Sequence, residues 1–227
     1  MRKKSKRYAE AKKLIDPAKA YTAKEAVALI KKTSTVKFDA GVELHIRLGV
    51  DPKKAEQVVR SSVVLPHGTG KEKRIAVFAD EKDQEKAKKA GAAVAGGEAL
   101  IQEIKKTGKC DFDIALATPA MMKVLGQVAK ILGPKGLMPT PRNETVTKDV
   151  EKSIKALLGG KVTFRNDDSS NIHQLIGRAS FEPKQLEENY AAFIDAVRSA
   201  KPSGFKGTYI KGISLCTTMG PGVKLAV

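Results

Sequence analysis

Three strand-and-helix units fill the middle of this 227-residue chain, at intervals of about twenty residues. Apolar runs at 75–79, 92–95 and 112–116 predict short buried strands. A charged helix is expected after the first strand, and further helices near 98–106 and 121–132. Because strands that alternate with helices form parallel sheets, this segment predicts a compact, three-layer, Rossmann-like α/β domain.

The first part of the chain has a different pattern. After a basic helical stretch, Thr22 and Glu25 are spaced as a capping box at the start of a second helix. Apolar residues over 42–48 then alternate with Glu43, His45 and Arg47, which predicts a strand with one buried and one polar face.

The last part of the chain again shows strands in which apolar and polar residues alternate. Alternation at 161–165 and a strand at 171–178 precede a helix that begins at Pro183, a favoured first helical residue, and a final strand over 207–217. Glycine-containing linkers near 66–70 and 159–160 separate the middle α/β segment from the two end segments. We therefore predict a discontinuous α+β sandwich formed by residues 1–67 and 160–227, with residues 68–159 inserted as the α/β domain.

The net charge indicates the class of partner. The chain carries +17, of which the two terminal segments hold +9 and +3 and the insert +5. Such an excess attracts a polyanion and makes the discontinuous domain the expected nucleic-acid face, although charge can also simply follow solvent exposure. Because aromatic residues make up 5% of the chain and Trp is absent, recognition of structured RNA by shape fits better than base stacking.

Motifs for catalysis and cofactor binding are incomplete. The segment 68–71 resembles part of a phosphate loop, but Leu65 stands where the first glycine is required and the hydroxyl residue is missing. No G-x-G-x-x-G or G-x-S-x-G is present, and the three histidines have no close metal-ligand partners in sequence. We expect no enzyme, no catalytic residue, no cofactor and no metal, while residues distant in sequence remain able to assemble a site.

The cysteines and the N-terminus bear on the compartment. Cys110 and Cys216 follow neither a C-x-x-C nor a zinc pattern, so we interpret them as packed thiols in a reducing environment. A charged run over 8–16 stands where a signal peptide would need an apolar core, and no apolar run approaches a membrane span. The sequence predicts a cytoplasmic protein without membrane contact.

Two glycine-containing segments remain. Residues 217–222, Thr-Thr-Met-Gly-Pro-Gly, would let a polyanion approach a bare backbone and small hydroxyls, or would simply form a turn at a strand end. Residues 132–141 follow a predicted helix, where Gly133 and Pro134 end the helix. Lys135 in this loop would hold a phosphate as a point charge, or the loop is a plain helix stop.

Several motifs together resemble one family. They are LGPKGLMP at 132–139, KFD at 37–39, LGVDPKKA at 48–55, FRND at 164–167, IGRASF at 176–181 and TTMG at 217–220. In their order along the chain, these motifs are similar to the bacterial large-subunit ribosomal protein L-one family, the protein of the mobile stalk beside the tRNA exit site. The resemblance spans nearly the whole chain.

The resemblance implies a function and a set of partners. It implies that the discontinuous domain binds a structured region of large-subunit rRNA in the ribosome, and that the inserted domain moves about a hinge and helps deacylated tRNA to leave. It also implies binding to the messenger of the protein's own operon, with repression of translation. The free protein is expected to be a monomer.

By matching position, the resemblance also implies RNA-binding residues. These are Lys37, Phe38, Glu43, Arg47, Arg165, Asn166, Asp167, His173, Arg178, Thr217, Thr218, Met219 and Gly220. Each has an alternative: Phe38 would also fit the core, the polar residues of 42–48 an ordinary solvated strand face, and His173 a structural role. Gly41 and Asp168 depart from the family pattern, since relatives commonly carry a hydroxyl and a basic residue there.

Two rival functions stay open on the sequence alone. A nonspecific nucleic-acid-binding protein would bind by charge, lose affinity steeply with salt and ignore RNA shape. A nucleotide-dependent enzyme built on the inserted domain would bind ATP or NAD through Lys71 or Lys135, against the missing fingerprints.

Overall fold

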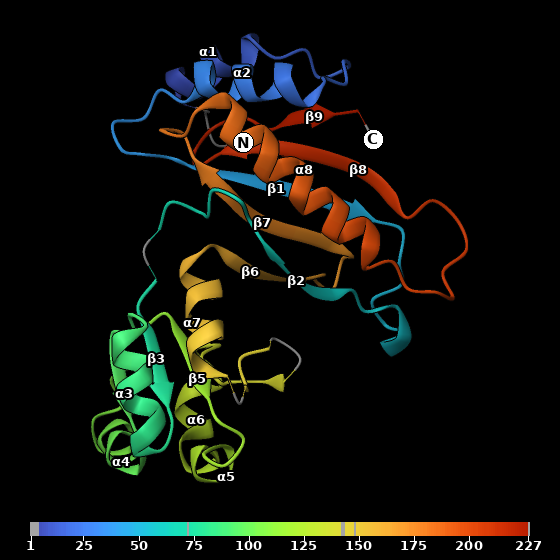
Figure 1. Cartoon of the computed structure of the whole chain (residues 1–227). Coiled ribbons are helices and arrows are strands. Elements are labelled where there is room, and N and C mark those ends of the chain that lie inside the picture. Colours follow the sequence, from blue (N-terminus) through green and yellow to red (C-terminus); the bar gives the residue numbers. More distant parts are fainter. Residues whose placement is uncertain (1–4, 72, 142–143, 148, 227) are drawn as a thin grey trace. The chain divides into compact units, whose positions relative to one another are not determined.

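The computed structural model describes residues 5–71, 73–141, 144–147 and 149–226, which divide into two compact units (Figure 1). Unit 1 is Met1–Gly70 with Val162–Val227, and unit 2 is Lys71–Lys161. The segments expected from the sequence end within three residues of these boundaries. Mixed α and β structure is confirmed as the fold class.

Unit 1 is built on an antiparallel four-stranded sheet of order β7-β1-β8-β9. Its strands are β1 (Gly41–Leu48), β7 (Asn171–Arg178), β8 (Ile210–Thr217) and β9 (Val223–Leu225). A second, two-stranded sheet joins β2 (Arg60–Val64) to β6 (Lys161–Arg165). The predicted strands at 42–48, 161–165 and 171–178 are thereby confirmed.

Helices pack on one face of the four-stranded sheet. Unit 1 contains α1 (Lys6–Lys13), α2 (Ala23–Thr33), the 3₁₀ turn η1 (Ala55–Gln57) and α8 (Pro183–Ser199). The capping box at Thr22 and Glu25 is present as predicted. Apolar residues of α2 and α8, such as Ile30 and Phe193, share one buried core with Leu44 of β1. The other face of the sheet carries mainly polar residues, with the partly exposed Leu175 opposite Glu43.

Unit 2 has helices against both faces of a parallel sheet. Its parallel sheet has the order β4-β3-β5, formed by β4 (Val94–Gly96), β3 (Ile75–Phe78) and β5 (Ile114–Ala117). Alternate residues of β3 point into two different cores. Ile75 and Val77 pack with α3 (Glu81–Lys89) and α7 (Val150–Leu158), whereas Ala76 and Phe78 pack with α4 (Glu98–Thr107) and the segment 121–132.

The segment 121–132 differs from the single helix that we predicted. It consists of α5 (Met122–Leu125), the 3₁₀ turn η2 (Gly126–Val128) and α6 (Ala129–Leu132). Gly126 and the β-branched Val128 are poor helix formers, which explains the tighter turn in the middle. Among the described residues, no helix has the length and apolar character needed to cross a membrane.

The linker at 66–70 has no regular structure but is held firmly. The Asn189 side chain is fully buried in α8 and bonds three main-chain groups. Its amide nitrogen donates to Gly68 O at 2.9 Å and to Ile176 O at 2.8 Å, and its oxygen accepts from His67 N at 3.1 Å. One buried amide therefore fixes the end of this linker against unit 1.

Candidate nucleic-acid interface

The outer face of the four-stranded sheet carries the polar residues that alternate with its core. We call Glu43, His45, Arg47, Asn171, His173, Ser214 and Cys216 the outer face; all have partly or fully exposed side chains. In the sheet register His45 lies opposite His173 and Ser214, and Glu43 lies opposite Cys216. The alternation predicted for 42–48 therefore places charge on a face that helices do not fill.

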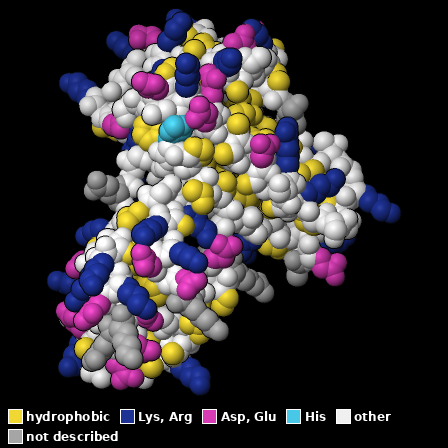
Figure 2. All heavy atoms as spheres, viewed as in Figure 1, with side chains coloured by type: hydrophobic (Ala, Val, Ile, Leu, Met, Phe, Trp, Pro, Cys, Tyr) yellow, Lys and Arg dark blue, Asp and Glu magenta, His cyan; other side chains and the backbone are white. Residues whose placement is uncertain are grey.

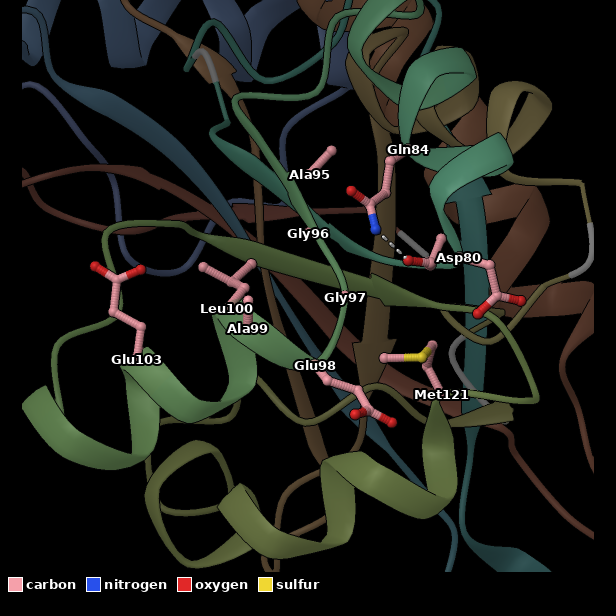
Figure 3. Close-up of a pocket in the computed structure, with 11 residues that line it drawn as sticks. Asp80, Gln84, Ala95, Gly96, Gly97, Glu98, Ala99, Leu100, Glu103 and Met121 are labelled. Atoms are coloured by element: carbon pink, nitrogen blue, oxygen red, sulfur yellow. Dashed lines mark hydrogen bonds between the residues drawn. The ribbon is translucent and has the colours of Figure 1, made fainter.

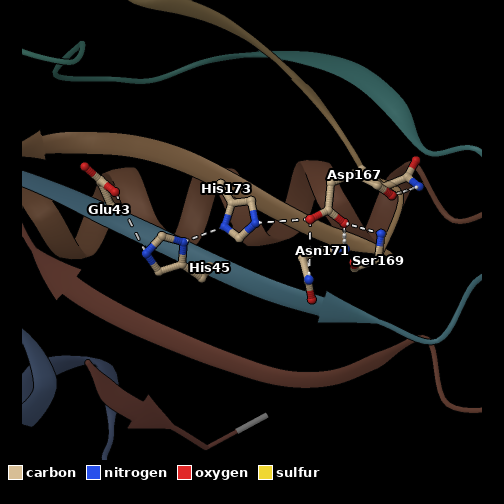
Figure 4. A network of polar contacts seen from close by, with 7 residues as sticks. Glu43, His45, Asp167, Ser169, Asn171 and His173 are labelled. Carbon is tan, nitrogen blue, oxygen red and sulfur yellow. Dashed lines mark hydrogen bonds and ion pairs between the residues drawn. The ribbon is translucent and has the colours of Figure 1, made fainter. Parts of the chain in front are cut away.

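A row of polar contacts crosses this face (Figure 4). His45 Nδ1 lies 2.7 Å from His173 Nδ1, and His173 Nε2 lies 3.4 Å from Asp167 Oδ2. At the other end Glu43 Oε2 lies 3.9 Å from His45 Nε2. Both ring nitrogens of His173 thus have partners, as the structural alternative for this residue required. Its side chain nevertheless remains 55% exposed.

Asp167 is anchored by the turn between β6 and β7. Its Oδ1 accepts hydrogen bonds from Asn171 N at 2.6 Å and from Ser169 N at 2.9 Å. The bond from Asn171 N is the main cause that holds the pKa of Asp167 below its usual value. The carboxylate is therefore ionised and fixed in place beside His173.

The 217–220 turn lies at one end of the sheet, between β8 and β9. Gly220 N donates to Thr217 O at 2.8 Å, and Thr218 N donates to Gly41 O at 2.9 Å. Met219, the third residue of the turn, has φ 65° and is 66% exposed. A side chain at Gly220 would be obstructed, since an added Cβ would lie 2.3 Å from Thr217 Oγ1. The segment therefore forms a turn at the end of a strand, as one of the two alternatives predicted, and this turn exposes the methionine side chain to solvent.

A second exposed apolar side chain lies on the loop that enters β1. Phe38 is 54% exposed, which excludes the core alternative, and the neighbouring Lys37 is exposed as well. The loop is held through Asp39, whose carboxylate accepts from Ser180 N at 3.1 Å and Ser180 Oγ at 2.9 Å. Since Gly41 also binds the 217–220 turn, both exposed apolar residues belong to the same end of the sheet.

The structure divides the predicted residues into exposed and buried ones. The exposed or partly exposed ones are Lys37, Phe38, Glu43, Arg47, Arg165, Asp167, His173, Arg178, Thr218, Met219 and Gly220. Asn166 and Thr217 are buried, at 5% and 2% exposure. Asn166 Oδ1 accepts from Val59 N at 2.8 Å, so this side chain holds two loops together and is not available at the surface. Arg178 Nη1 donates a hydrogen bond to Asp39 O.

The departure at Gly41 has a local explanation. An added Cβ there would lie 2.7 Å from Leu175 Cδ1 and 3.2 Å from Thr218 Oγ1. Leu175 therefore occupies the space that a side chain at position 41 would need. Asp168, the other departure, lies exposed in the loop after β6, and nothing in the structure explains it.

Sequence reasoning missed the position of Cys216 on the outer face. Its Sγ lies 3.1 Å from His45 Nε2, although the two residues are 171 positions apart. Alternation along 210–217 places Ser214 and Cys216 on one face of β8. The register between β8 and β1, which brings them to His45, could not be derived from the chain alone.

Charge alone does not locate an interface. Figure 2 shows Lys and Arg side chains spread over the visible face of both units among Asp and Glu, without a single large basic patch. The outer face itself includes the acidic Glu43, with Asp167 beside it. The positions of individual side chains therefore indicate where nucleic acid binds better than net charge does.

The nucleotide-binding alternative is not favoured by unit 2. A pocket lies at the carboxyl ends of β3 and β4, where doubly wound domains bind nucleotides (Figure 3). Its described lining includes Asp80, Glu98 and Glu103 but neither Lys nor Arg. Lys71 pairs with Asp113 at 3.2 Å, and Lys135 donates to Gly108 O at 2.9 Å. Phosphates would meet carboxylates here, and the two candidate lysines are engaged elsewhere.

Comparison with known proteins agrees with the resemblance. A sequence profile described as Ribosomal protein L1p/L10e family matches residues 30–221. The chain is 51% identical over 225 residues to Large ribosomal subunit protein uL1 of Thermosipho melanesiensis, covering 99% of this chain and 97% of that protein. It is 50% identical over 225 residues to the protein of the same name from Fervidobacterium nodosum, covering 99% and 96%.

These names describe ribosomal proteins and not enzymes, in agreement with the expectation from the incomplete motifs. The profile covers far more than half of the chain, and the identity to each relative extends over nearly its whole length. The chain therefore belongs to the Ribosomal protein L1p/L10e family.

Proposed function

We propose that this protein is a structural constituent of the large ribosomal subunit, and that unit 1 binds a structured region of large-subunit rRNA. The contact surface comprises the outer face together with the 217–220 turn and Phe38. One observation carries the proposal: Met219 is held in a left-handed backbone conformation with 66% of its side chain exposed.

The exposed side chain of Met219 gains no burial that would offset the backbone strain, although its main-chain oxygen accepts a hydrogen bond from Arg7 Nη2 at 3.5 Å. A positive φ at this turn position is easily adopted by Gly or Asn, whereas other residues there store on the order of 1 kcal/mol of strain. Hydrogen bonds from Thr218 N and Gly220 N nevertheless hold the turn in shape. A rigid apolar tip beside small hydroxyls and Gly220 suits packing against riboses or an exposed base.

Polar residues along β1 extend the surface away from this end. Arg47 is exposed and able to bind phosphate, and Glu43 accepts a hydrogen bond from a ribose 2′-hydroxyl more readily than it would face phosphate. An eight-residue strand such as β1 is about 25 Å long. The surface therefore offers a row of contacts long enough for the backbone of a folded RNA.

Buried candidates take supporting roles in this proposal. Asn166 holds the loop that carries Asp167, and Thr217 packs beneath Gly220. Arg178 ties β7 to the loop of Phe38 through Asp39 O. Substituting these residues would change RNA affinity through the shape of the surface.

The family resemblance supports further parts of the function. We propose that unit 2 assists release of deacylated tRNA from the exit site, and that unit 1 binds a similar RNA shape on the messenger of its own operon to repress translation. The protein would act in the cytoplasm as part of the ribosome and be a monomer when free. The match to ribosomal relatives over 99% of the chain supports a place in the large ribosomal subunit, whereas the roles toward tRNA and messenger rest on the family resemblance.

Binding of the purified full chain to a ribosomal stalk RNA fragment tests the proposal. The measurement is made at near-physiological salt with an unrelated hairpin of equal length as competitor. We expect a preference of at least about a hundredfold for the stalk fragment, since specific complexes exceed nonspecific ones by roughly that or more. Equal affinity for both RNAs would instead identify a nonspecific binder that relies on its charge of +17.

A further inference from the structure

Three different metal-binding side chains meet on the outer face. Glu43 and His45 come from β1 and Cys216 from β8, and one ligand atom of each lies within 4.8 Å of the others. His45 Nε2 is 3.1 Å from Cys216 Sγ and 3.9 Å from Glu43 Oε2. Carboxylate, imidazole and thiol are the three side-chain types that bind Zn²⁺.

The hydrogen-bond row fixes which nitrogen of His45 is free to bind. Asp167 is an ionised acceptor, so His173 donates its Nε2–H to it. In the neutral form of His173, Nδ1 then carries a lone pair and accepts the Nδ1–H of His45, whose Nδ1 lies 2.7 Å away. The remaining lone pair of His45, on Nε2, points to the group formed by Cys216 and Glu43.

We propose that Glu43, His45 and Cys216 bind one Zn²⁺ ion, with His173 and Asp167 as the residues that orient His45. In tetrahedral zinc sites, ligand atoms at about 2.0–2.3 Å from the metal lie about 3.4–3.6 Å apart. The separations from His45 Nε2, 3.1 Å to Cys216 Sγ and 3.9 Å to Glu43 Oε2, lie on either side of this range, and the Glu43 and Cys216 ligand atoms lie within 4.8 Å of each other. Small side-chain rotations therefore suffice to close the site around the metal.

Binding requires one proton to leave. Zinc binds cysteine as the thiolate, whereas a free cysteine is mainly a thiol at neutral pH. As the zinc–sulfur bond forms, the thiol proton passes to solvent and the thiolate stays on the metal. The two positive charges of the ion balance the carboxylate and the thiolate.

Three protein ligands leave one position open. The side chains of Glu43 and His45 are 42% and 30% exposed, so solvent reaches this position. Zinc sites with three protein ligands take water or another oxygen as the fourth ligand. An occupied site would place a metal with exchangeable solvent in the centre of the outer face, in contrast to our expectation of a protein without metal.

Cobalt substitution tests the site directly. The full chain is reduced, freed of metal with a chelator and titrated with Co²⁺, which replaces zinc and reports its ligands by absorption. We expect saturation at one equivalent, tetrahedral bands in the visible and a thiolate-to-cobalt charge-transfer band in the near ultraviolet. Added Zn²⁺ should displace the cobalt and abolish these bands. Because no RNA is present, the outcome is independent of the proposed RNA contacts.

Variants separate this site from other thiols and histidines. Cys216→Ser should abolish the charge-transfer band, whereas Cys110→Ser, which alters the other free and half-buried thiol, should keep it. His45→Asn and Glu43→Gln should each weaken binding at least about tenfold. His173→Asn should weaken it about 10–100-fold while the band persists, as expected for a residue that orients a ligand. Circular dichroism checks that each variant is folded.

The proposal is overturned by any of three results. These are the absence of saturable cobalt binding to the folded full chain, a charge-transfer band that survives Cys216→Ser, or a band that is lost in folded Cys110→Ser. If Cys216→Ser does not fold, the cobalt titrations of Glu43→Gln and His45→Asn decide. Unchanged cobalt affinity in both variants would place the binding site elsewhere and overturn the proposal.

Discussion

Unit 1 and unit 2 each fold around a sheet, but they bury it differently. The parallel sheet of unit 2 contributes to two cores, with helices against both faces. The antiparallel sheet of unit 1 contributes Leu44, Ile46 and their neighbours to one core and keeps Glu43, His45 and Arg47 outside. An antiparallel sheet can leave one face in water, whereas a parallel sheet is normally covered on both. Unit 1 therefore has a sheet surface available for binding.

The two units also differ in their exposed apolar residues. In unit 2 Leu158 is 50% exposed at the end of a helix, beside the glycine linker. The described part of unit 1 exposes Leu14, Phe38, Val64 and Met219, and of these Phe38 and Met219 lie at the end of the sheet that carries the 217–220 turn. A single exposed apolar residue is normal on a protein surface, so the proposed contact site rests on the position of this pair next to the outer face.

Met219→Asp should have the largest effect. A carboxylate at the tip of the turn would face RNA phosphates, so affinity for the stalk fragment should fall about 100-fold, equivalent to about 2.7 kcal/mol. Folding should be preserved because Asp tolerates a positive φ better than most residues. Filter binding and thermal unfolding measure the two quantities.

Leu158→Asp is the matched control in unit 2. It places the same charge on a comparably exposed apolar residue and should leave RNA affinity within about threefold, since charge outside a contact surface acts only through screened solution. Equal loss of affinity in both variants would show that added negative charge, and not the 217–220 turn, weakens binding.

Asn189→Ala should have the next largest effect, on stability. It leaves two buried carbonyls and one N–H without their partner, which should destabilise unit 1 by about 2 kcal/mol. All four tyrosines lie in unit 1 and the chain has no Trp, so tyrosine fluorescence reports unit 1 in urea unfolding. Far-ultraviolet circular dichroism reports both units together.

Gln84→Ala serves as the comparison for Asn189→Ala. Gln84 is a partly buried amide of unit 2 that donates a single hydrogen bond, to Ala79 O at 2.8 Å. It should leave the tyrosine transition unchanged. A shift of that transition by Gln84→Ala as large as the one from Asn189→Ala would mean that the units do not unfold separately.

A smaller effect is expected from Asp113 in unit 2. Arg74 N donates to its carboxylate at 3.1 Å, which together with Lys71 lowers its pKa in the folded protein. A lowered pKa stabilises the fold above the unfolded value of about 3.9, and this contribution is lost as pH falls through the lower folded value. Asp113→Asn should therefore destabilise unit 2 at neutral pH by less than about 1 kcal/mol and flatten its acid dependence.

The measurement is circular dichroism of urea unfolding between neutral and acidic pH, with tyrosine fluorescence as the signal from unit 1. Asp195→Asn is the control, because Asp195 on α8 is 75% exposed and only approaches Arg198, at 3.8 Å. If the stability of unit 2 depends on pH in Asp113→Asn as it does in the unchanged protein, the lowered pKa of Asp113 does not contribute to that stability.

Periodicity predicted the parts of the fold where one residue in two, or one face of a helix, is buried. The strand at β7 and the helix that begins at Pro183 were located from such patterns. In contrast, β2 was not predicted, because none of its residues is fully buried and its pattern shows no alternation. The three-residue β9 is too short to give a period, and no strand was predicted at 223–225.

The candidate site was predictable in part for a similar reason. In the 217–220 turn, Met219 follows two threonines and precedes Gly220, and these small neighbours are visible in the sequence. Burial of Asn166 depends on a hydrogen bond to Val59, which is 107 residues away. The meeting of His45 with His173 and Cys216 depends on the registers of two strand pairs. Local patterns do not determine long-range register, so neither feature follows from them.

Removal of unit 2 should have the smallest effect on RNA binding. Replacing Lys71–Lys161 with a short glycine bridge keeps the outer face, the 217–220 turn and the Asn189 contacts within unit 1. We expect its affinity for the stalk fragment to stay within about threefold of the full chain, since long-range charge is screened beyond roughly 10 Å at physiological salt. A cooperative tyrosine-fluorescence transition must accompany the result. If the shortened protein unfolds cooperatively and yet binds the fragment no better than an unrelated hairpin, residues of unit 2 contribute to recognition, and the contrast between an open and a covered sheet does not explain where RNA binds.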